Sequence, residues 1–65
     1  MNKYSLIRPK DTALKAGISV SHLYHLVSAG KFPSPISLSE RISVFIEAEV
    51  DEWIKAKISE SREES

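Results

Sequence analysis

Four side chains that form hydrogen bonds readily lie close together in the segment SVSHLYHLVSAG, which begins at Ser19 and ends at Gly30. They are Ser21, His22, Tyr24 and His25. Hydroxyl and imidazole groups donate and accept hydrogen bonds, but none of these four side chains is a strong cation. The segment is therefore either an ordinary packed helix or the part of the molecule that touches a partner.

The same residues do not match the pattern of a catalytic or metal site. His22 and His25 are three residues apart, but the sequence around them offers no third ligand. Asp11, Glu40 and the histidines do not stand at a spacing known for general acid–base catalysis. The chain has no cysteine, which excludes a disulfide framework and a Cys-based zinc site. The sequence therefore predicts neither an enzyme nor a protein that holds a metal ion or a cofactor.

A short helix would have to position these side chains. Ser19 suits its N-cap, because a serine hydroxyl accepts a hydrogen bond from a free N–H of the first turn. Helical spacing joins one set of apolar residues into a single stripe, namely Val20, Leu23, Leu26 and Val27. The opposite face is polar and carries Ser21, His25 and Ser28, with His22 and Tyr24 at its two sides. Gly30 then ends the helix.

The segments on either side of this helix have patterns of their own. Leu6-Ile7 predicts a very short strand, and Pro9 suits the first turn of a helix that Gly17 ends. After the second helix, Pro33 and Pro35 exclude further helix. Apolar and polar residues then alternate over 36–38 and, in part, over 43–46, which predicts a small hairpin with a polar tip.

A last helix is predicted by apolar residues that keep helical spacing from Ile46 to Ile58. Trp53 falls on its apolar face and is therefore expected in the core rather than as a stacking platform. Acidic residues crowd the first turn and Lys55 and Lys57 the later ones, as the helix dipole favours. We expect one domain over residues 1–58, followed by a polar, disordered tail over residues 59–65.

The charges of this 65-residue chain cancel overall but are distributed unevenly. Residues 1–46 contain six Lys and Arg against two Asp and Glu, a net charge of +4. Residues 47–65 contain three against seven, a net charge of −4. This asymmetry suggests a basic working face and an acidic back, although acids also suit the start of a helix. The absence of cysteine, of a secretory signal and of a long apolar run favours a reducing cytoplasm.

The order helix, glycine turn, helix, hairpin, helix is that of a winged helix-turn-helix. We therefore expect a mainly α fold with three helices and a two- or three-stranded β wing. The small Ala13 lets the first two helices cross closely, and Gly17 makes the sharp turn between them. The core contacts that such a unit needs are expected from Ile18, Leu23 and Leu26.

With these features the chain resembles the AlpA-like prophage regulators, a family related to small excisionases and to the DNA-binding heads of MerR-type regulators. The resemblance covers about Leu6 to Ile58 and is carried by LIRP, GISVSHLYHLVSAGKFPSPISL and RISVFIEAEVDEWI. The family often has Pro-Glu and an aliphatic residue early in its first helix, where this chain has KDT at residues 10–12. It often has Gly near the wing tip and Trp at the end of the hairpin, where this chain has Ser39 and Phe45.

The resemblance implies sequence-specific binding of double-stranded DNA, either to regulate a prophage or mobile-element gene or to assist excision. The second helix would then enter the major groove. Candidates for base contacts are Ser21, His22 and His25. Candidates for phosphate contacts on the same helix are Ser19 and Tyr24. Candidates for holding the DNA backbone or the adjacent minor groove are Lys31 and the wing residues Arg41 and Ser43.

Two classes of function remain open. A DNA-binding regulator is favoured by the uneven charge and by the polar face of the second helix. A protein-interaction adaptor for a repressor, a recombinase such as an integrase, or an RNA polymerase subunit is favoured by the zero net charge. Tyr24 could instead cover the edge of the core, and Arg41 could be a solvated turn residue. Because one small domain covers little DNA, we also expect a homodimer or a cooperative array on repeated sites.

Overall fold

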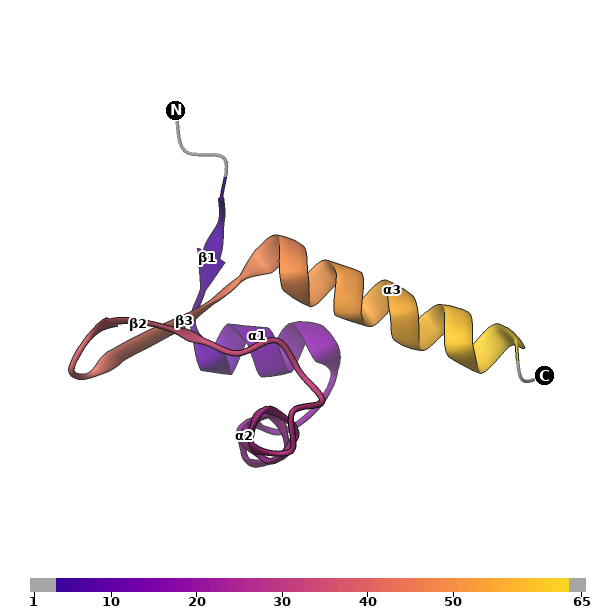
Figure 1. The fold of residues 1–65 in the computed structure, drawn as a ribbon, viewed down its shortest axis with the longest axis horizontal. Coiled ribbons are helices and arrows are strands. Elements are labelled where there is room, and N and C mark those ends of the chain that lie inside the picture. The colour runs from indigo at the N-terminus through magenta and orange to yellow at the C-terminus, as the bar shows by residue number, and fades with distance from the viewer. Residues whose placement is uncertain (1–3, 64–65) are drawn as a thin grey trace.

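Two short helices joined by a tight turn follow a two-residue first strand. The computed structural model describes residues 4–63, and Figure 1 shows how their elements are arranged. The helices are α1 (Pro9–Ala16), α2 (Val20–Ser28) and α3 (Glu47–Glu63); the strands are β1 (Leu6–Ile7), β2 (Ile36–Ser39) and β3 (Ile42–Ile46). Three helices and a small antiparallel sheet confirm the expected mainly α fold with a β wing.

Backbone hydrogen bonds to the last turn of α1 hold the connection between α1 and α2. Gly17 has a φ of 75°, a left-handed conformation that strains residues with a side chain. The N–H of Ile18 donates to the carbonyl oxygen of Ala13 at 3.0 Å, and the N–H of Gly17 donates to that of Leu14 at 3.1 Å. These two bonds form a Schellman motif, which confirms the role expected for Gly17.

Thr12 is fully buried on α1. Its Oγ1 donates to the carbonyl oxygen of Arg8 at 2.9 Å, and its backbone N–H donates to the same oxygen. The hydroxyl is therefore satisfied within its own helix. Burial of this polar side chain leaves no group without a partner.

β3 is the middle strand of the sheet, whose antiparallel order is β1-β3-β2. β2 and β3 form the predicted hairpin, and the polar pair Glu40-Arg41 connects them. The register shifts between Ser37 and Ser39, so Leu38 is an extra residue on β2. Such a bulge increases the local twist of the wing near its tip.

The core lies between the helices and one face of the sheet. Its buried residues come from the three helices, the middle strand and the linker after α2, and are Ala13, Leu23, Phe32, Phe45 and Val50. The ring of Phe32 meets Phe45 edge-on, with 5.6 Å between centroids, and lies 4.7 Å from Trp53. Trp53 packs against this cluster, as its helical spacing predicted.

α3 differs from its predicted bounds at both ends. Ile46 is the last residue of β3, so the helix starts at Glu47. The helix continues to Glu63, and the expectation of a disordered tail is wrong for residues 59–63; residues 64–65 lie outside the described part of the chain. Extending an existing helix adds one backbone hydrogen bond per residue, and the pair Lys57–Glu60 at 3.6 Å supports this end.

Figure 1 shows α3 extending beyond the rest of the molecule and α1 lying between α3 and α2. Within residues 4–63 no helix is long and apolar enough to cross a membrane.

A three-way ion pair joins α1 to the start of α3. The Nζ of Lys15 lies 2.8 Å from a carboxylate oxygen of Glu47 and 2.8 Å from one of Asp51. Hydrogen bonds to Asp51 and to Glu47 raise the pKa of Lys15 above its ordinary value of 10.5. The hydrogen bond from Lys15, and then one from Ser5, lower the pKa of Glu47 below its ordinary value of 4.5.

We predict that Lys15→Gln lowers the melting temperature at neutral pH and that this deficit shrinks in acid. A carboxylate whose pKa is lowered by folding stabilises the protein above its unfolded pKa, and this contribution is lost as pH falls through the folded pKa. Thermal unfolding followed by circular dichroism at neutral pH and at about pH 2 measures the difference. Lys10→Gln, which removes the same charge from α1, should not lower the melting temperature. An equal deficit for Lys15→Gln at both pH values would contradict the prediction.

Candidate functional site

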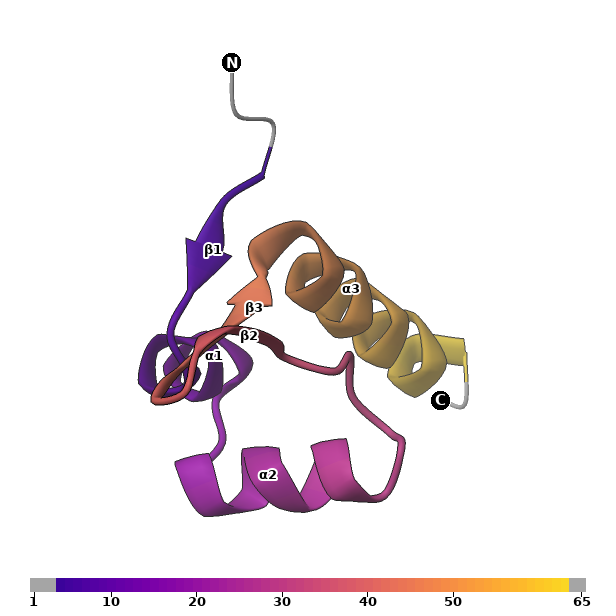
Figure 2. The same ribbon diagram turned by 60° about the vertical axis from the view of Figure 1, so that its left-hand side comes forward.

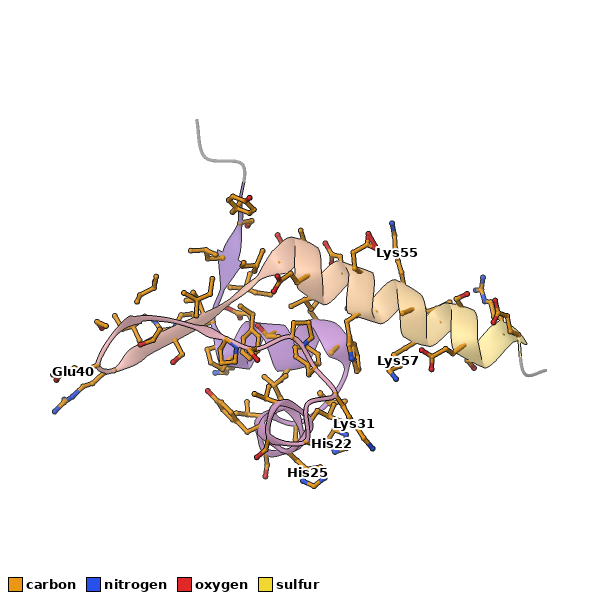
Figure 3. All side chains as sticks on the ribbon, viewed as in Figure 1. His22, His25, Lys31, Glu40, Lys55 and Lys57 are labelled. Atoms are coloured by element: carbon orange, nitrogen blue, oxygen red, sulfur yellow. The ribbon has the colours of Figure 1, made fainter. Side chains whose placement is uncertain are left out.

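The polar face of α2 lies at the surface. Its four hydrogen-bonding side chains, Ser21, His22, Tyr24 and His25, are all exposed. Figure 3 shows His22 and His25 pointing away from the body of the protein, and their ring centroids are 6.2 Å apart. Leu23, which lies between them in sequence, is fully buried. The structure therefore brings these candidates together on one open face of one helix.

The apolar side of α2 is narrower than the sequence pattern indicated. Leu23 is in the core and Leu26 and Val27 pack against it, but Val20 is 39% exposed. Tyr24 is 44% exposed, so a large part of its side chain remains open to solvent. The first turn of α2 thus projects from the core more than its spacing predicted.

Ser19 is the N-cap of α2. Its Oγ accepts a hydrogen bond from the backbone N–H of His22 at 3.0 Å. This bond confirms the predicted cap and engages one acceptor position of the hydroxyl. The hydroxyl proton remains available to donate.

Lys31 is held in place through its backbone. Its N–H donates to the carbonyl oxygen of Leu26 at 2.9 Å, across Gly30, which has a φ of 73°. Its own carbonyl oxygen accepts a hydrogen bond of 2.7 Å from Nε1 of Trp53. The side chain of Lys31 is exposed, and Figure 3 shows it on the same side of the molecule as His22.

The contact between Trp53 and Lys31 was not predicted from the sequence. The sequence indicates only that the indole N–H of a packed tryptophan needs a hydrogen-bond acceptor. The sequence does not say which carbonyl oxygen that acceptor is, because the two residues are 22 positions apart.

The wing carries the last two candidates. Arg41 is exposed at the tip, next to Glu40, which Figure 3 shows at the far end of the hairpin. Ser43 pairs with Ser37 across the hairpin and is half-buried. Because side chains alternate along a strand, Ser43 lies on the same sheet face as Phe45, which packs against the helices. Ser43 thus faces the helix side of the wing. The positive charge of Arg41 lies next in sequence to the negative charge of Glu40.

The uneven charge of the sequence does not separate cleanly into two faces. Lys15 belongs to the basic half of the chain but is bound to Glu47 and Asp51 of the acidic half. It therefore contributes no free positive charge to a basic face. Of the candidates, Lys31 after α2 and Arg41 in the wing are exposed cations.

The candidate site is a surface and not a cavity. A hollow of about 410 Å³ beside α3 and one of about 450 Å³ at the sheet are lined by none of the eight candidates. Within residues 4–63, no three His, Asp or Glu side chains come together as metal ligands do. Exposed hydroxyl, phenol and imidazole groups on one helix can read the hydrogen-bond donors and acceptors of a large partner.

The closed glycine turn, the three-stranded wing and the open polar face of α2 define a small winged helix-turn-helix protein. The family model described as prophage CP4-57 regulatory protein (AlpA) matches residues 5–58. The chain belongs to this family of prophage regulatory proteins. Comparisons with curated proteins and with solved structures gave no match.

We predict that Ser19→Ala destabilises the protein by about 1 kcal/mol, because it removes the side-chain acceptor of an N-cap. Ser21→Ala, two residues away on the exposed face, should change the stability by less than about 0.5 kcal/mol. Urea denaturation followed by circular dichroism measures both free energies of unfolding. Equal effects of the two substitutions would show that the hydroxyl of Ser19 is not the cap.

Proposed function

We propose that this protein binds double-stranded DNA and regulates a prophage or mobile-element gene, or assists excision of the element. The observation that carries the proposal is the open polar face of α2 in a winged helix-turn-helix of a prophage regulatory family. Packing accounts for Leu23, Leu26 and Val27 on this helix, but not for its exposed hydrogen-bonding groups. We propose no catalytic activity for this protein, and we propose that it acts in the bacterial cytoplasm.

In this proposal α2 lies in the major groove. The residues that would contact base edges are Ser21, His22 and His25. Tyr24 and the N-terminus of α2 at Ser19 would contact phosphates, since hydroxyl groups and free backbone N–H groups both suit an anion. Lys31 would bind the backbone beside the groove, and the wing residues Arg41 and Ser43 the backbone or the neighbouring minor groove.

The modest positive charge of this surface limits the expected specificity and affinity of DNA binding by one copy. α2 has no Lys or Arg, so its base contacts discriminate weakly and the cations that flank it supply the attraction to phosphate. One copy covers a small stretch of DNA, at the low end for specific binding. We therefore propose that copies assemble on repeated sites, as a dimer or a cooperative array.

We predict that DNA affinity falls steeply with salt. Contact with about four to six phosphates, shared among the copies of a dimer or array, gives a slope of about −4 to −5 in a plot of log affinity against log salt concentration. Fluorescence anisotropy with the DNA upstream of its own gene measures this slope. A flat slope, or no binding at low salt, would contradict DNA binding and favour the adaptor for a repressor, recombinase or polymerase subunit.

We predict different effects for a backbone contact and a base contact. Arg41→Ala should weaken binding to all DNA sequences alike, whereas His25→Ala should change the sequence preference by about 1 kcal/mol or less at the affected base pair, below the range of a bidentate contact. Binding to a set of single-base operator variants separates the two effects. Lys55→Ala is the matched control, because Figure 3 shows Lys55 pointing away from the side of α2. A uniform effect of His25→Ala would rule out base contact by this residue.

A further inference from the structure

The face of the sheet that turns away from the core is apolar. Side chains alternate along β3, so Phe45 points into the core and Val44 and Ile46 point to the other side. Cross-strand partners share a face, and the register pairs Leu6 with Ile46 and Ile36 with Val44. We call this set the outer sheet face; it consists of Leu6, Ile36, Ile42, Val44 and Ile46.

Three of the five side chains of this face are exposed. Leu6 is 42% exposed, Ile36 39% and Ile42 38%. Val44 is only 4% exposed although it lies outside the core cluster. The largest contiguous apolar patch on the surface of a monomeric protein is often functional.

The outer sheet face also contains a hollow of about 450 Å³. Its lining consists of Tyr4, Leu6, Ile36, Ile46 and Glu49. Four of these five side chains are apolar or aromatic, and Glu49 from the first turn of α3 is the charged one. No ion pair of Glu49 is recorded within residues 4–63, whereas Glu47 and Asp51 are bound to Lys15. Glu49 therefore gives the rim of the hollow one negative charge.

These properties narrow the choice of occupant. A stable dimer interface needs about 20–30 residues a side, far more than this face offers. Addition of a strand to β2 is opposed by Pro33 and Pro35 before it and by the bulge at Leu38. The carboxylate of Glu49 repels DNA phosphates and attracts a cation. A short protein segment with apolar side chains beside Lys or Arg fits the size, the polarity and the charge.

We infer that the outer sheet face docks a short apolar and basic segment of another protein, with its apolar side chains in the hollow and Lys or Arg at Glu49. The core separates this face from α2, because Leu23 of α2 and Phe45 of β3 belong to the same buried cluster. Figure 2 shows β1 and α2 at opposite ends of the molecule. A segment docked here leaves the polar face of α2 open, so the inference does not depend on DNA binding.

Capped hexapeptides are suitable probes. One alternates leucine and lysine, a second alternates leucine and glutamate, and a third alternates serine and lysine. Titration into the ¹⁵N-labelled full chain should show saturable shifts of the amides of Leu6, Ile36, Ile46 and Glu49 with the leucine–lysine peptide. The leucine–glutamate peptide should bind about threefold or more weakly, which corresponds to one exposed charge pair. The serine–lysine peptide should leave these amides unchanged.

Two variants test the apolar and the charged part separately. Ile36→Thr keeps a β-branched residue in the strand. It should lower the affinity for the leucine–lysine peptide about fivefold, because it removes apolar area that the peptide would bury. Glu49→Gln should abolish the preference for lysine over glutamate. Leu14→Gln is the matched control: Leu14 is 78% exposed on α1, outside the outer sheet face, and its loss should not change peptide affinity.

Three results would overturn the inference. The first is the absence of saturable shifts with the leucine–lysine peptide, or shifts confined to α2 or α3. The second is equal affinity for the lysine and glutamate peptides in the unsubstituted chain. The third is burial of the outer sheet face by a second copy, seen as concentration-dependent broadening of its amides together with a dimer in sedimentation.

The peptide experiments and the DNA-binding experiments can fail independently of each other. Ile36→Thr should leave DNA affinity unchanged, and a DNA duplex should not shift the amides of the outer sheet face. Shifts of these amides by DNA would overturn the inference. If Ile36→Thr fails to fold, the titration of the unsubstituted chain and the Glu49→Gln variant still decide it.

Discussion

Phe45 joins the parts of this small domain. It is fully buried on the middle strand, and its cluster contains residues of α1, α2, α3 and the linker after α2. A chain of this length buries a small core, so each shared contact carries a large part of the stability. The edge-on contact with Phe32 brings the linker onto this cluster, and the bond from Trp53 to the carbonyl oxygen of Lys31 fixes where the linker leaves α2. The placement of α2 and of Lys31 thus depends on the core around Phe45.

The position of Phe45 on β3 also divides the surface. With Phe45 turned inward, alternation sends Val44 and Ile46 to the outer sheet face and Ser43 to the helix side of the wing. The helix side carries α2 with its hydrogen-bonding groups, whereas the outer face is apolar with Glu49 at its rim. A polar, weakly cationic surface and an apolar, negative one suit partners of different chemistry. Because the core separates these two surfaces, covering one of them would leave the other open.

Structural features that depend on residues close together in the sequence could be predicted from the sequence. The cap at Ser19, the left-handed turn at Gly17 and the start of α1 at Pro9 follow from single residues and their immediate context. The exposure of Ser21 and His25 follows from helical periodicity, which places them opposite Leu23. The winged helix-turn-helix and the family followed from the order of elements and from the quoted segments. The end of α3 was mispredicted because a polar segment can still extend a helix that packing has already nucleated.

The sequence by itself determined the elements, their order and the polar face of α2, since these depend on contacts within a few residues. The tertiary structure decided which side chains are free to act. Lys15 counts as a cation in the sequence, yet it is neutralised by Glu47, 32 positions away. Leu6 and Ile36 are apolar strand residues in the sequence, yet they lie outside the core cluster and remain 42% and 39% exposed. Both outcomes depend on how helices and strands cross, and periodicity along the chain does not contain that information.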